Sequence, residues 1–368
     1  MGSCRIRKAV KDIPPYVPGK SINEVARELG LTHITKLASN ENVIGPSPLA
    51  IKAIQRHLQE IHRYPEDSSY DLKQGLARRL GVRAENILLG TGADEVLLLL
   101  GQLFLDPGDE CLYPYPSFPV YRKSTRVMGA TPVECPLEDD RIRVDDLLAR
   151  VTSRTKLVFL CNPNNPTGHL IPGEEVLSFV QRLPEHVFPV IDEAYAEFVT
   201  DPRFQDGVDL FRKGHPLAAV RTFSKIYGIA GLRVGYAVVP EELSAAADNI
   251  RNSFNISVLA QAAALAALGD EEHVTRTVAS TLSGRDQLFK GLQKMGLNPI
   301  PSEANFVCVG VNRSAEEVFR QLLTRGLIIR PLTAFSMPRH IRITVGTPEE
   351  NRAVLKALAE VLGVRGGS

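Results

Sequence analysis

Short apolar runs alternate with helical segments through the centre of the chain, and this alternation limits the folds that the sequence can adopt. Five runs of mostly Val, Ile, Leu and Ala are expected to be buried strands. They are residues 87–89, 157–161, 190–191, 218–220 and 236–239. Segments with helical spacing, such as 176–183, lie between them. This order of elements predicts an α/β fold with a mostly parallel sheet.

The two ends of the chain differ from this centre. The opening residues are rich in proline, up to Pro46 and Pro48, and are expected to form an arm rather than a core element. After about Gln261 the pattern changes to a long Ala/Leu-rich helix followed by a smaller α+β region. We therefore expect an N-terminal arm that joins a small domain (1–45), a large domain (46–260) and a small C-terminal domain (261–368).

Composition and charge exclude several classes of protein. The formal net charge of the 368 residues is +1, which gives no reason to expect a nucleic-acid partner. No apolar run approaches the roughly 18 residues of a membrane span, so no membrane association is expected. The five cysteines include no Cys-x-x-Cys pair, and the eight histidines include no His-x-x-x-His pair. We expect reduced thiols, no metal site and a cytoplasmic protein.

A carboxylate follows a predicted strand at Asp192, in the run Asp192-Glu193-Ala194-Tyr195. Active sites of open α/β sheets lie beyond the carboxyl ends of the strands. Magnesium binding beside a nucleotide would require a phosphate loop, and no Gly-x-x-x-x-Gly-Lys-Ser/Thr pattern occurs. Two interpretations stay open. Asp192 caps a helix, or it pairs with a pyridinium nitrogen and keeps that nitrogen protonated.

Lys225 follows the next strand, in Thr222-Phe223-Ser224-Lys225. Most lysines are solvated surface charges. A lysine that forms a Schiff base must instead be partly desolvated, because only the neutral amine reacts. A strand end beside a cofactor would supply that setting. Thr222, Ser224 and Arg233 would offer hydroxyls and a guanidinium to a phosphate group.

Two further strand ends carry polar turns. The run Gly90-Thr91-Gly92-Ala93-Asp94-Glu95 opens a helix, whose free amides and dipole favour an anion. A Rossmann motif is excluded because Glu95 stands where the third glycine belongs, and a simple glycine turn is an equally good interpretation. Residues 161–168 contain prolines and asparagines typical of tight turns. Asn165 in this turn could donate a hydrogen bond to an aromatic oxygen.

Together these motifs resemble the class I/II aminotransferases, pyridoxal 5′-phosphate (PLP) enzymes of fold type I, and within them the histidinol-phosphate aminotransferases. The resemblance runs from about Pro14 to about Val361 and so covers nearly the whole chain. Seven motifs in the order of the family carry it. They are Asn40-Glu41-Asn42, Arg63-Tyr64-Pro65, Gly92-Ala93-Asp94-Glu95, Asn164-Asn165-Pro166-Thr167-Gly168, Asp192-Glu193-Ala194-Tyr195, Thr222-Phe223-Ser224-Lys225 and Ile341-Arg342-Ile343-Thr344-Val345-Gly346.

The resemblance implies a large PLP-binding domain with a mostly parallel sheet and a smaller α+β domain. Lys225 would hold the cofactor as a Schiff base and shuttle the substrate proton, and Asp192 would pair with the pyridine nitrogen. The remaining implied contacts are Asn165 and Tyr195 to the phenolic oxygen, Tyr115 on the ring face, and Ala93, Asp94, Ser224 and Arg233 at the phosphate. Tyr64 would reach the phosphate from the partner subunit, which implies a homodimer.

The same resemblance implies the residues that bind substrate. Arg342 would hold the substrate carboxylate or phosphate, and Arg330 would be a second anion contact for histidinol phosphate. Tyr16 and Asn305 would complete the pocket. An ordinary surface ion pair is the alternative for Arg330.

The implied reaction is a reversible transamination between histidinol phosphate and 2-oxoglutarate. It yields imidazole-acetol phosphate and glutamate and belongs to histidine biosynthesis. An aromatic amino-acid aminotransferase and a phosphothreonine-type decarboxylase fit the same motifs. A PLP-binding sensor domain is the non-enzymatic alternative, but no basic DNA-binding segment precedes the expected fold.

Overall fold

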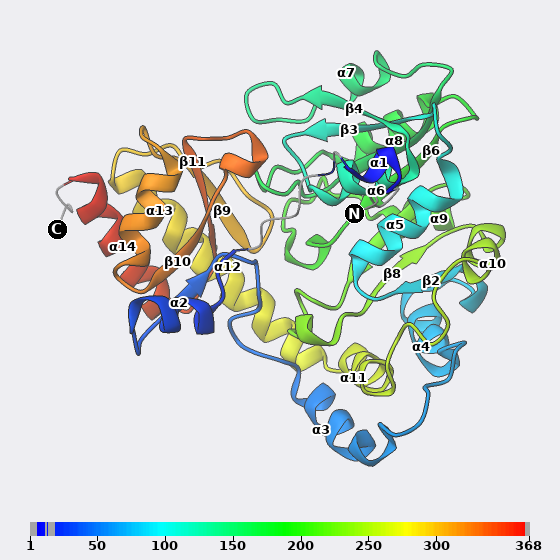
Figure 1. The fold of residues 1–368 in the computed structure, drawn as a ribbon, viewed down its shortest axis with the longest axis horizontal. Coiled ribbons are helices and arrows are strands. Elements are labelled where there is room, and N and C mark those ends of the chain that lie inside the picture. Colours follow the sequence, from blue (N-terminus) through cyan, green and yellow to red (C-terminus); the bar gives the residue numbers. More distant parts are fainter. Residues whose placement is uncertain (1–5, 12, 14–18, 365–368) are drawn as a thin grey trace, which may run out of the picture.

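The computed structural model describes residues 6–11, 13 and 19–364 of the chain. Its strands form two sheets, one of seven strands and one of four. Figure 1 shows the two sheets side by side, each with its own helices, and a long helix that runs from one body to the other.

The larger sheet has the strand order β2-β8-β7-β6-β5-β3-β4. Strand β8 is antiparallel to both of its neighbours, whereas β7, β6, β5, β3 and β4 pair in parallel. The prediction of a mostly parallel sheet is therefore confirmed. The strands are β2 (Ile87–Gly90), β3 (Glu110–Tyr115), β4 (Thr131–Pro136), β5 (Thr155–Cys161), β6 (Phe188–Asp192), β7 (Ala218–Thr222) and β8 (Gly235–Val238).

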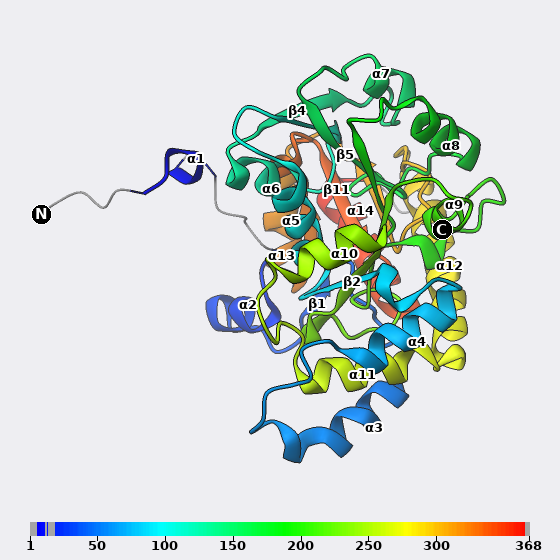
Figure 2. The same ribbon diagram turned by 90° about the vertical axis from the view of Figure 1, so that its right-hand side faces the viewer.

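Helices cover both faces of this sheet (Figure 2). One face packs against α5 (Ala93–Phe104), α6 (Val120–Met128) and α10 (Glu241–Asp248). The other face is covered by α4 (Tyr70–Leu80), α7 (Val144–Leu148), α8 (Gly173–Arg182), α9 (Gly207–Arg212) and α11 (Val258–Leu268), and α3 (Pro48–His57) packs against α11. The central strands are thus buried on both sides, which explains their nearly continuous apolar sequence.

The smaller sheet has the order β1-β10-β11-β9. Its first strand, β1 (Thr35–Leu37), pairs in parallel with β10 (Leu327–Pro331), so that Thr35 lies opposite Leu327. Strands β11 (His340–Thr344) and β9 (Phe306–Gly310) continue the sheet in antiparallel fashion. Leu292, Leu322 and Leu358 form its core with the strands. They belong to α12 (Glu271–Lys294), α13 (Ala315–Leu323) and α14 (Pro348–Leu362).

The long Ala/Leu-rich helix predicted after about Gln261 is shorter than expected, because the structure has two helices there, α11 and α12. Asp270 stands between them as the N-cap of α12, and its carboxylate accepts the backbone N–H of His273 at 3.3 Å. Its other oxygen accepts the hydroxyl of Ser47 at 2.5 Å. A capping carboxylate held in this way favours the start of a new helix.

The N-terminal segment contributes short elements. Pro48, expected in the arm, is instead the first residue of α3, a position where the fixed φ and missing N–H of proline are tolerated. Pro14, Pro15 and Pro18 lie outside the described residues. The remaining elements are α1 (Lys8–Lys11), α2 (Ile22–Leu29) and the 3₁₀ helices η1 (Leu58–Glu60), η2 (Ala84–Asn86), η3 (Ala196–Phe198), η4 (Ala230–Leu232) and η5 (Thr333–Phe335). Among the described residues, no helix combines the length and the apolar character that crossing a bilayer requires.

Candidate active site

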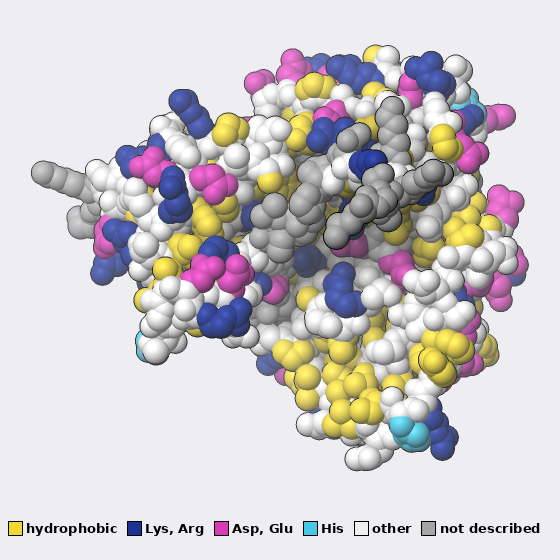
Figure 3. Space-filling view, viewed as in Figure 1, with side chains coloured by type: hydrophobic (Ala, Val, Ile, Leu, Met, Phe, Trp, Pro, Cys, Tyr) yellow, Lys and Arg dark blue, Asp and Glu magenta, His cyan; other side chains and the backbone are white. Residues whose placement is uncertain are grey.

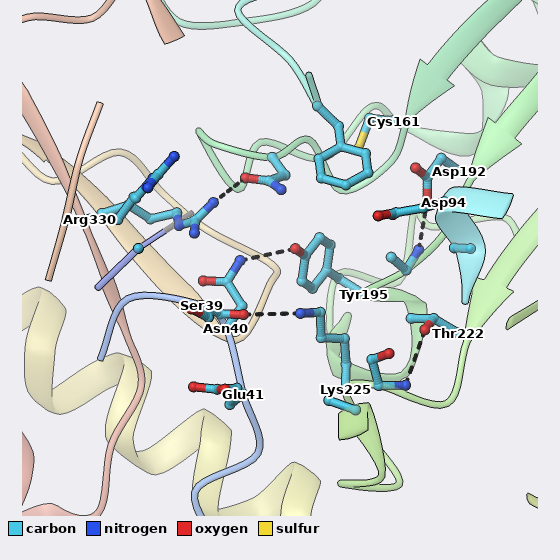
Figure 4. A pocket seen from close by; sticks show the side chains of 18 of the residues that line it. Ser39, Asn40, Glu41, Asp94, Cys161, Asp192, Tyr195, Thr222, Lys225 and Arg330 are labelled. Carbon is cyan, nitrogen blue, oxygen red and sulfur yellow. Dashed lines mark hydrogen bonds between the residues drawn. The ribbon is translucent and has the colours of Figure 1, made fainter. Parts of the chain in front are cut away.

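A cavity of about 270 Å³ lies where the carboxyl ends of β5, β6 and β7 meet the N-terminus of α5 and the strands β10 and β11 (Figure 4). Both bodies of the molecule therefore contribute to its wall. The described residues that line it are Gly19, Ala38, Ser39, Asn40, Glu41, Ala93, Asp94, Phe118, Cys161, Asn165, Asp192, Ala194, Tyr195, Thr222, Ser224, Lys225, Ala230, Arg233, Arg330, Phe335 and Arg342.

Lys225 extends into this cavity from the turn after β7. Its Nζ donates to the carbonyl oxygen of Ser39 at 3.1 Å and lies 6.0 Å from the centre of the Tyr195 ring (Figure 4). Burial, assisted by the guanidinium of Arg342, lowers the pKa of Lys225 from 10.5 to about 8. Because the charged form is disfavoured, a useful fraction of the amine is neutral near neutral pH and can act as a nucleophile.

The low pKa predicts how the reactivity of Lys225 depends on pH. Because the pKa of Lys225 in the folded protein is lowered, its neutral amine forms as the pH rises through about 8. An ordinary lysine becomes neutral only near pH 10.5. In the cofactor-free protein, trinitrobenzenesulfonate should label Lys225 at a rate that levels off above about pH 8. Mass spectrometry of labelled peptides measures this rate, with Nα-acetyl-lysine as the control. A rate that parallels the control up to pH 10 would contradict the assignment.

Asp192 ends β6 and lies at the opposite side of the cavity. Its Oδ2 accepts the hydroxyl of the buried Tyr121 at 2.7 Å, and its Oδ1 accepts the backbone N–H of Ala194 at 3.2 Å. Burial raises the pKa of Asp192 from 3.8 to about 6, although the Tyr121 hydroxyl opposes this shift. A carboxylate of this kind gains from a cationic partner, because such a partner offsets the cost of burying its charge.

Arg342 and Asn165 meet at the side of the cavity formed by the small sheet. The Nη1 of Arg342 donates to the Oδ1 of Asn165, and its Nη2 donates to the carbonyl oxygen of Ala38 at 2.9 Å. Since the carbonyl oxygen of the Asn165 side chain faces Arg342, its amide N–H groups are available as donors toward the cavity.

An anion site forms at the N-terminus of α5. Gly92 has φ +80°, and a Cβ there would lie 2.3 Å from the Nη2 of Arg233, so only glycine allows this close approach. The guanidinium of Arg233 lies 3.4 Å from the Ser224 hydroxyl and beside the start of the helix that contains Ala93 and Asp94. Backbone amides, a hydroxyl and a guanidinium together match a phosphate group.

A second cationic region faces the first across the cavity. Arg330 on β10 and Arg342 on β11 are directly opposite each other in the antiparallel pair. Both are buried, and the guanidinium of Arg330 lies 5.8 Å from the centre of the Phe335 ring. Two buried guanidiniums on adjacent strands suit an anionic ligand that enters between the bodies.

Two predicted site residues lie elsewhere. Tyr115 lines a neighbouring cavity, where its hydroxyl hydrogen-bonds to Ser336 at 2.7 Å, and Phe118 contributes its ring to the wall of the cavity that contains Lys225. Asn305 is buried behind the wall, and its Nδ2 donates to the carbonyl oxygen of Asn40 at 3.0 Å. Neither residue lines the cavity. Tyr115 is the last residue of β3 and Asn305 comes just before β9, so the turns at these strand ends place both side chains behind its wall.

The other predicted residues fall into three groups. Lys225 and the rest of the large-domain set come together in one cavity, as do Arg330 and Arg342. Tyr64 is 83% exposed, away from the cavity of its own chain, and its ring stacks on Phe254. Tyr16 lies outside the described residues. Sequence reasoning gave no role to Ser39 and Asn40, although the motif that contains Asn40 was recognised.

Comparison with known proteins agrees with this geometry. Residues 32–358 match the model of the family described as aminotransferase class I and II. The chain is 44% identical to a histidinol-phosphate aminotransferase 2 of Carboxydothermus hydrogenoformans, over 98% of this chain and 99% of that protein. It is 42% identical to the histidinol-phosphate aminotransferase of Moorella thermoacetica, over 97% and 93% of the two chains.

Two solved structures extend this likeness to three dimensions. The histidinol-phosphate aminotransferase of Sinorhizobium meliloti, in complex with pyridoxal-5′-phosphate, has a TM-score of 0.89 and 31% identity over 98% of each chain. The aspartate aminotransferase of Thermus thermophilus with maleate has a TM-score of 0.85 and 25% identity over 98% of this chain and all of the other. The chain therefore belongs to the class I and II aminotransferases.

Proposed function

We propose that the protein is a PLP-dependent histidinol-phosphate aminotransferase. It would transfer the amino group of histidinol phosphate to 2-oxoglutarate and release imidazole-acetol phosphate and glutamate, as a step of histidine biosynthesis. The observation that carries this proposal is a single cavity that joins a desolvated lysine, a buried aspartate and two separate cationic regions. The names of the similar proteins support the choice of substrate.

The residues of the cavity fit PLP. When bound, PLP supplies a reactive aldehyde carbon and a protonated ring that withdraws electrons. Lys225 would attach it covalently, and the buried carboxylate of Asp192 would hold the proton on the ring nitrogen. Asn165 and Tyr195 would donate to the ring oxygen. The phosphate would be bound by Ala93, Asp94, Thr222, Ser224 and Arg233.

The protein's own groups account for the proton transfers. The Nζ of Lys225 is neutral in a substantial fraction of molecules near pH 8, so it can take the proton from the substrate α-carbon and return it. The wall formed by Ser39, Tyr195 and the carboxyl ends of the strands surrounds this amine and limits its access to water. Phe118, rather than Tyr115, would cover the ring face.

Arg330 and Arg342 would bind the anionic end of the substrate. Histidinol phosphate has a phosphate group and no carboxylate, whereas 2-oxoglutarate has two carboxylates. The cross-strand pair of guanidiniums can serve both, because planar guanidiniums bind either anion bidentately. Arg330 is buried and lines the cavity, which favours an anion contact over an ordinary surface ion pair.

The choice between histidinol phosphate and an aromatic amino acid can be tested in a half-reaction. The holoenzyme is mixed with L-histidinol phosphate or L-phenylalanine, without an oxo acid, and the cofactor spectrum is followed. Histidinol phosphate should convert the cofactor to its amine form rapidly and phenylalanine slowly. The reverse order would favour an aromatic amino-acid aminotransferase, and no conversion with either would favour a decarboxylase or a sensor.

Arg330→Met should reduce kcat/KM for histidinol phosphate by about tenfold to a hundredfold, because a charged hydrogen bond in a buried site contributes about 1.5–3 kcal/mol. Phenylalanine turnover should fall much less, since Arg342 would hold its single carboxylate and it carries no phosphate for Arg330. Steady-state kinetics with both substrates measure the difference. Arg325→Met removes an exposed guanidinium just before β10 and serves as the control. Equal losses with both substrates would contradict the assignment.

We further propose that the chain is a homodimer with shared active sites. Large exposed apolar side chains gather around α3 and the loop that follows it (Figure 3). A contiguous patch of this kind typically marks a protein–protein contact. It contains Tyr64, whose phenol would reach the phosphate site of a second copy. The exposed apolar residues of this stretch are Leu49, Ile51, Leu58, Ile61 and Tyr64, and the exposed Phe254 stacks on Tyr64.

The domain boundaries at residues 45 and 260 and the cytoplasmic location stay predictions. The two sheets support a division into a large and a small domain, with β1 belonging to the small one. The four described cysteines are buried and free, which suits a reducing compartment.

A further inference from the structure

Asn40 occupies an unusual position on the wall of the cavity. It follows β1, is only 1% exposed, and has φ +54°, a conformation that costs energy for a residue other than glycine. All of its polar groups are engaged. Its backbone N–H donates to Thr344 Oγ1 at 2.9 Å, its carbonyl oxygen accepts from Asn305, and its side-chain Nδ2 donates to the Tyr195 hydroxyl oxygen at 2.9 Å.

The contact with Thr344 fixes which end of the Asn40 amide faces Tyr195. The Thr344 hydroxyl accepts the backbone N–H of Asn40 and donates its own hydrogen to Asn40 Oδ1 at 3.2 Å. The amide oxygen is therefore directed to Thr344 and the amide nitrogen to Tyr195 (Figure 4). A nitrogen that donates cannot accept. The hydroxyl hydrogen of Tyr195 must then point away from Asn40, toward the cavity.

We propose that Asn40 is a positioning residue that makes Tyr195 a hydrogen-bond donor toward the cavity, and that Thr344 sets the orientation of Asn40. This inference rests on the proposed function, in which the Tyr195 hydroxyl donates to the ring oxygen of PLP. Asn40 acts on the reaction through Tyr195.

The same contacts connect Tyr195 with the strand that carries Arg342. Thr344 and Arg342 both lie on β11, and Arg342 Nη2 donates to the carbonyl oxygen of Ala38. Strand β11 therefore holds both ends of the segment 38–40, while Lys225 donates to its middle residue, Ser39. A shift of β11 on substrate binding would move the hydrogen-bond partners of both Tyr195 and Lys225.

The pH titration of the absorbance of bound PLP tests this role. A hydrogen bond donated to the ring oxygen stabilises its anion and lowers the pH at which the chromophore takes up a proton. Asn40→Asp is nearly isosteric but presents an acceptor, so Tyr195 should donate to it and no longer to the cofactor. The titration midpoint should rise by about 0.5–1 pH unit. Thr344→Val should shift it in the same direction, because the amide loses its orientation.

Two matched variants separate this role from a general loss of packing. Thr344→Ser keeps the hydroxyl and should titrate like the wild type. Thr155→Val removes another buried threonine hydroxyl, at the start of β5, and should leave the midpoint unchanged. Wild-type midpoints in both Asn40→Asp and Thr344→Val, with PLP bound, would overturn the proposal.

A measurement without cofactor keeps the inference separate from the proposed function. Unfolding free energies of cofactor-free Asn40→Ala, Tyr195→Phe and the double variant form a cycle. The double variant should lose less unfolding free energy than the sum of the losses in the two single variants. Additive effects would overturn the Asn40–Tyr195 contact. Failure of the wild type to bind PLP would contradict the proposed function, and the cycle would still decide on the contact.

Discussion

Lys225→Ala is expected to abolish transamination, with a loss in kcat of at least about 10⁴-fold, while the fold stays intact. The variant removes the amine proposed both to hold the cofactor and to transfer the substrate proton. Burial lowers the pKa of Lys225, so this lysine binds fewer protons in the folded than in the unfolded chain between about pH 8 and 10.5. It therefore destabilises the cofactor-free protein below pH 8. The variant should melt no lower than the wild type at pH 7.

Turnover and calorimetry of the cofactor-free protein check both parts of this expectation, and full activity would contradict the role of Lys225. Refolding two inactive or impaired variants together tests whether the active site is shared between two chains. Tyr64→Ala chains keep Lys225 but lack the phenol proposed to cross the dimer interface. Chains of Lys225→Ala and Tyr64→Ala, refolded together, should regain activity, because half of the sites in a mixed dimer contain neither substitution. Without recovery, the site would belong to one chain alone.

Asp192→Asn should reduce kcat by about 10²–10³-fold, a loss typical of removing one charged partner from a preorganised site. Asparagine has almost the same shape: its oxygen can still accept the Ala194 N–H, while its amide nitrogen can donate to the Tyr121 hydroxyl oxygen. It cannot hold a proton on the ring nitrogen by charge, so the electron-withdrawing power of the cofactor falls. Steady-state kinetics, together with the spectrum of the bound cofactor, measure this loss.

The stability of the cofactor-free Asp192→Asn variant should increase, although its kcat falls. Burial raises the pKa of Asp192 from 3.8 to about 6, so the folded state binds more protons than the unfolded chain within this window. The stability of the cofactor-free protein therefore falls as the pH rises through it, by on the order of 3 kcal/mol in total. Asp192→Asn should remove this pH dependence and raise the melting temperature at pH 7. A variant both inactive and less stable would show that Asp192 is mainly structural.

The sequence predicted most of the site because its residues follow apolar strands. Asp192 ends a predicted strand, Asn165 and Lys225 lie in the turns that follow two others, and parallel strands bring their carboxyl ends to one edge. Arg342 and Arg330 were identified through the family resemblance alone. Their position opposite each other depends on the register of β10 and β11, which no local pattern in the sequence specifies.

The residues whose positions differ from expectation lie in or beside loops. Tyr115 and Phe118 are three residues apart, and the path of the turn after β3 decides which ring reaches the cavity. Asn305 and Asn40 are polar residues in connecting segments, and their roles depend on contacts with distant parts of the chain. The break between α11 and α12 depends likewise on the contact between Asp270 and Ser47.

The pairing of β1 with β10 has a consequence for how the protein is made. A ribosome releases the seven strands of the larger sheet by residue 238, and domains generally fold as units from the N-terminal side. Strand β1 leaves the ribosome earlier still but has no partner until Leu327–Pro331 follows. The nascent chain can thus complete its large sheet long before the catalytic cavity exists. Newly made enzyme becomes competent to bind substrate only in the last stage of its synthesis.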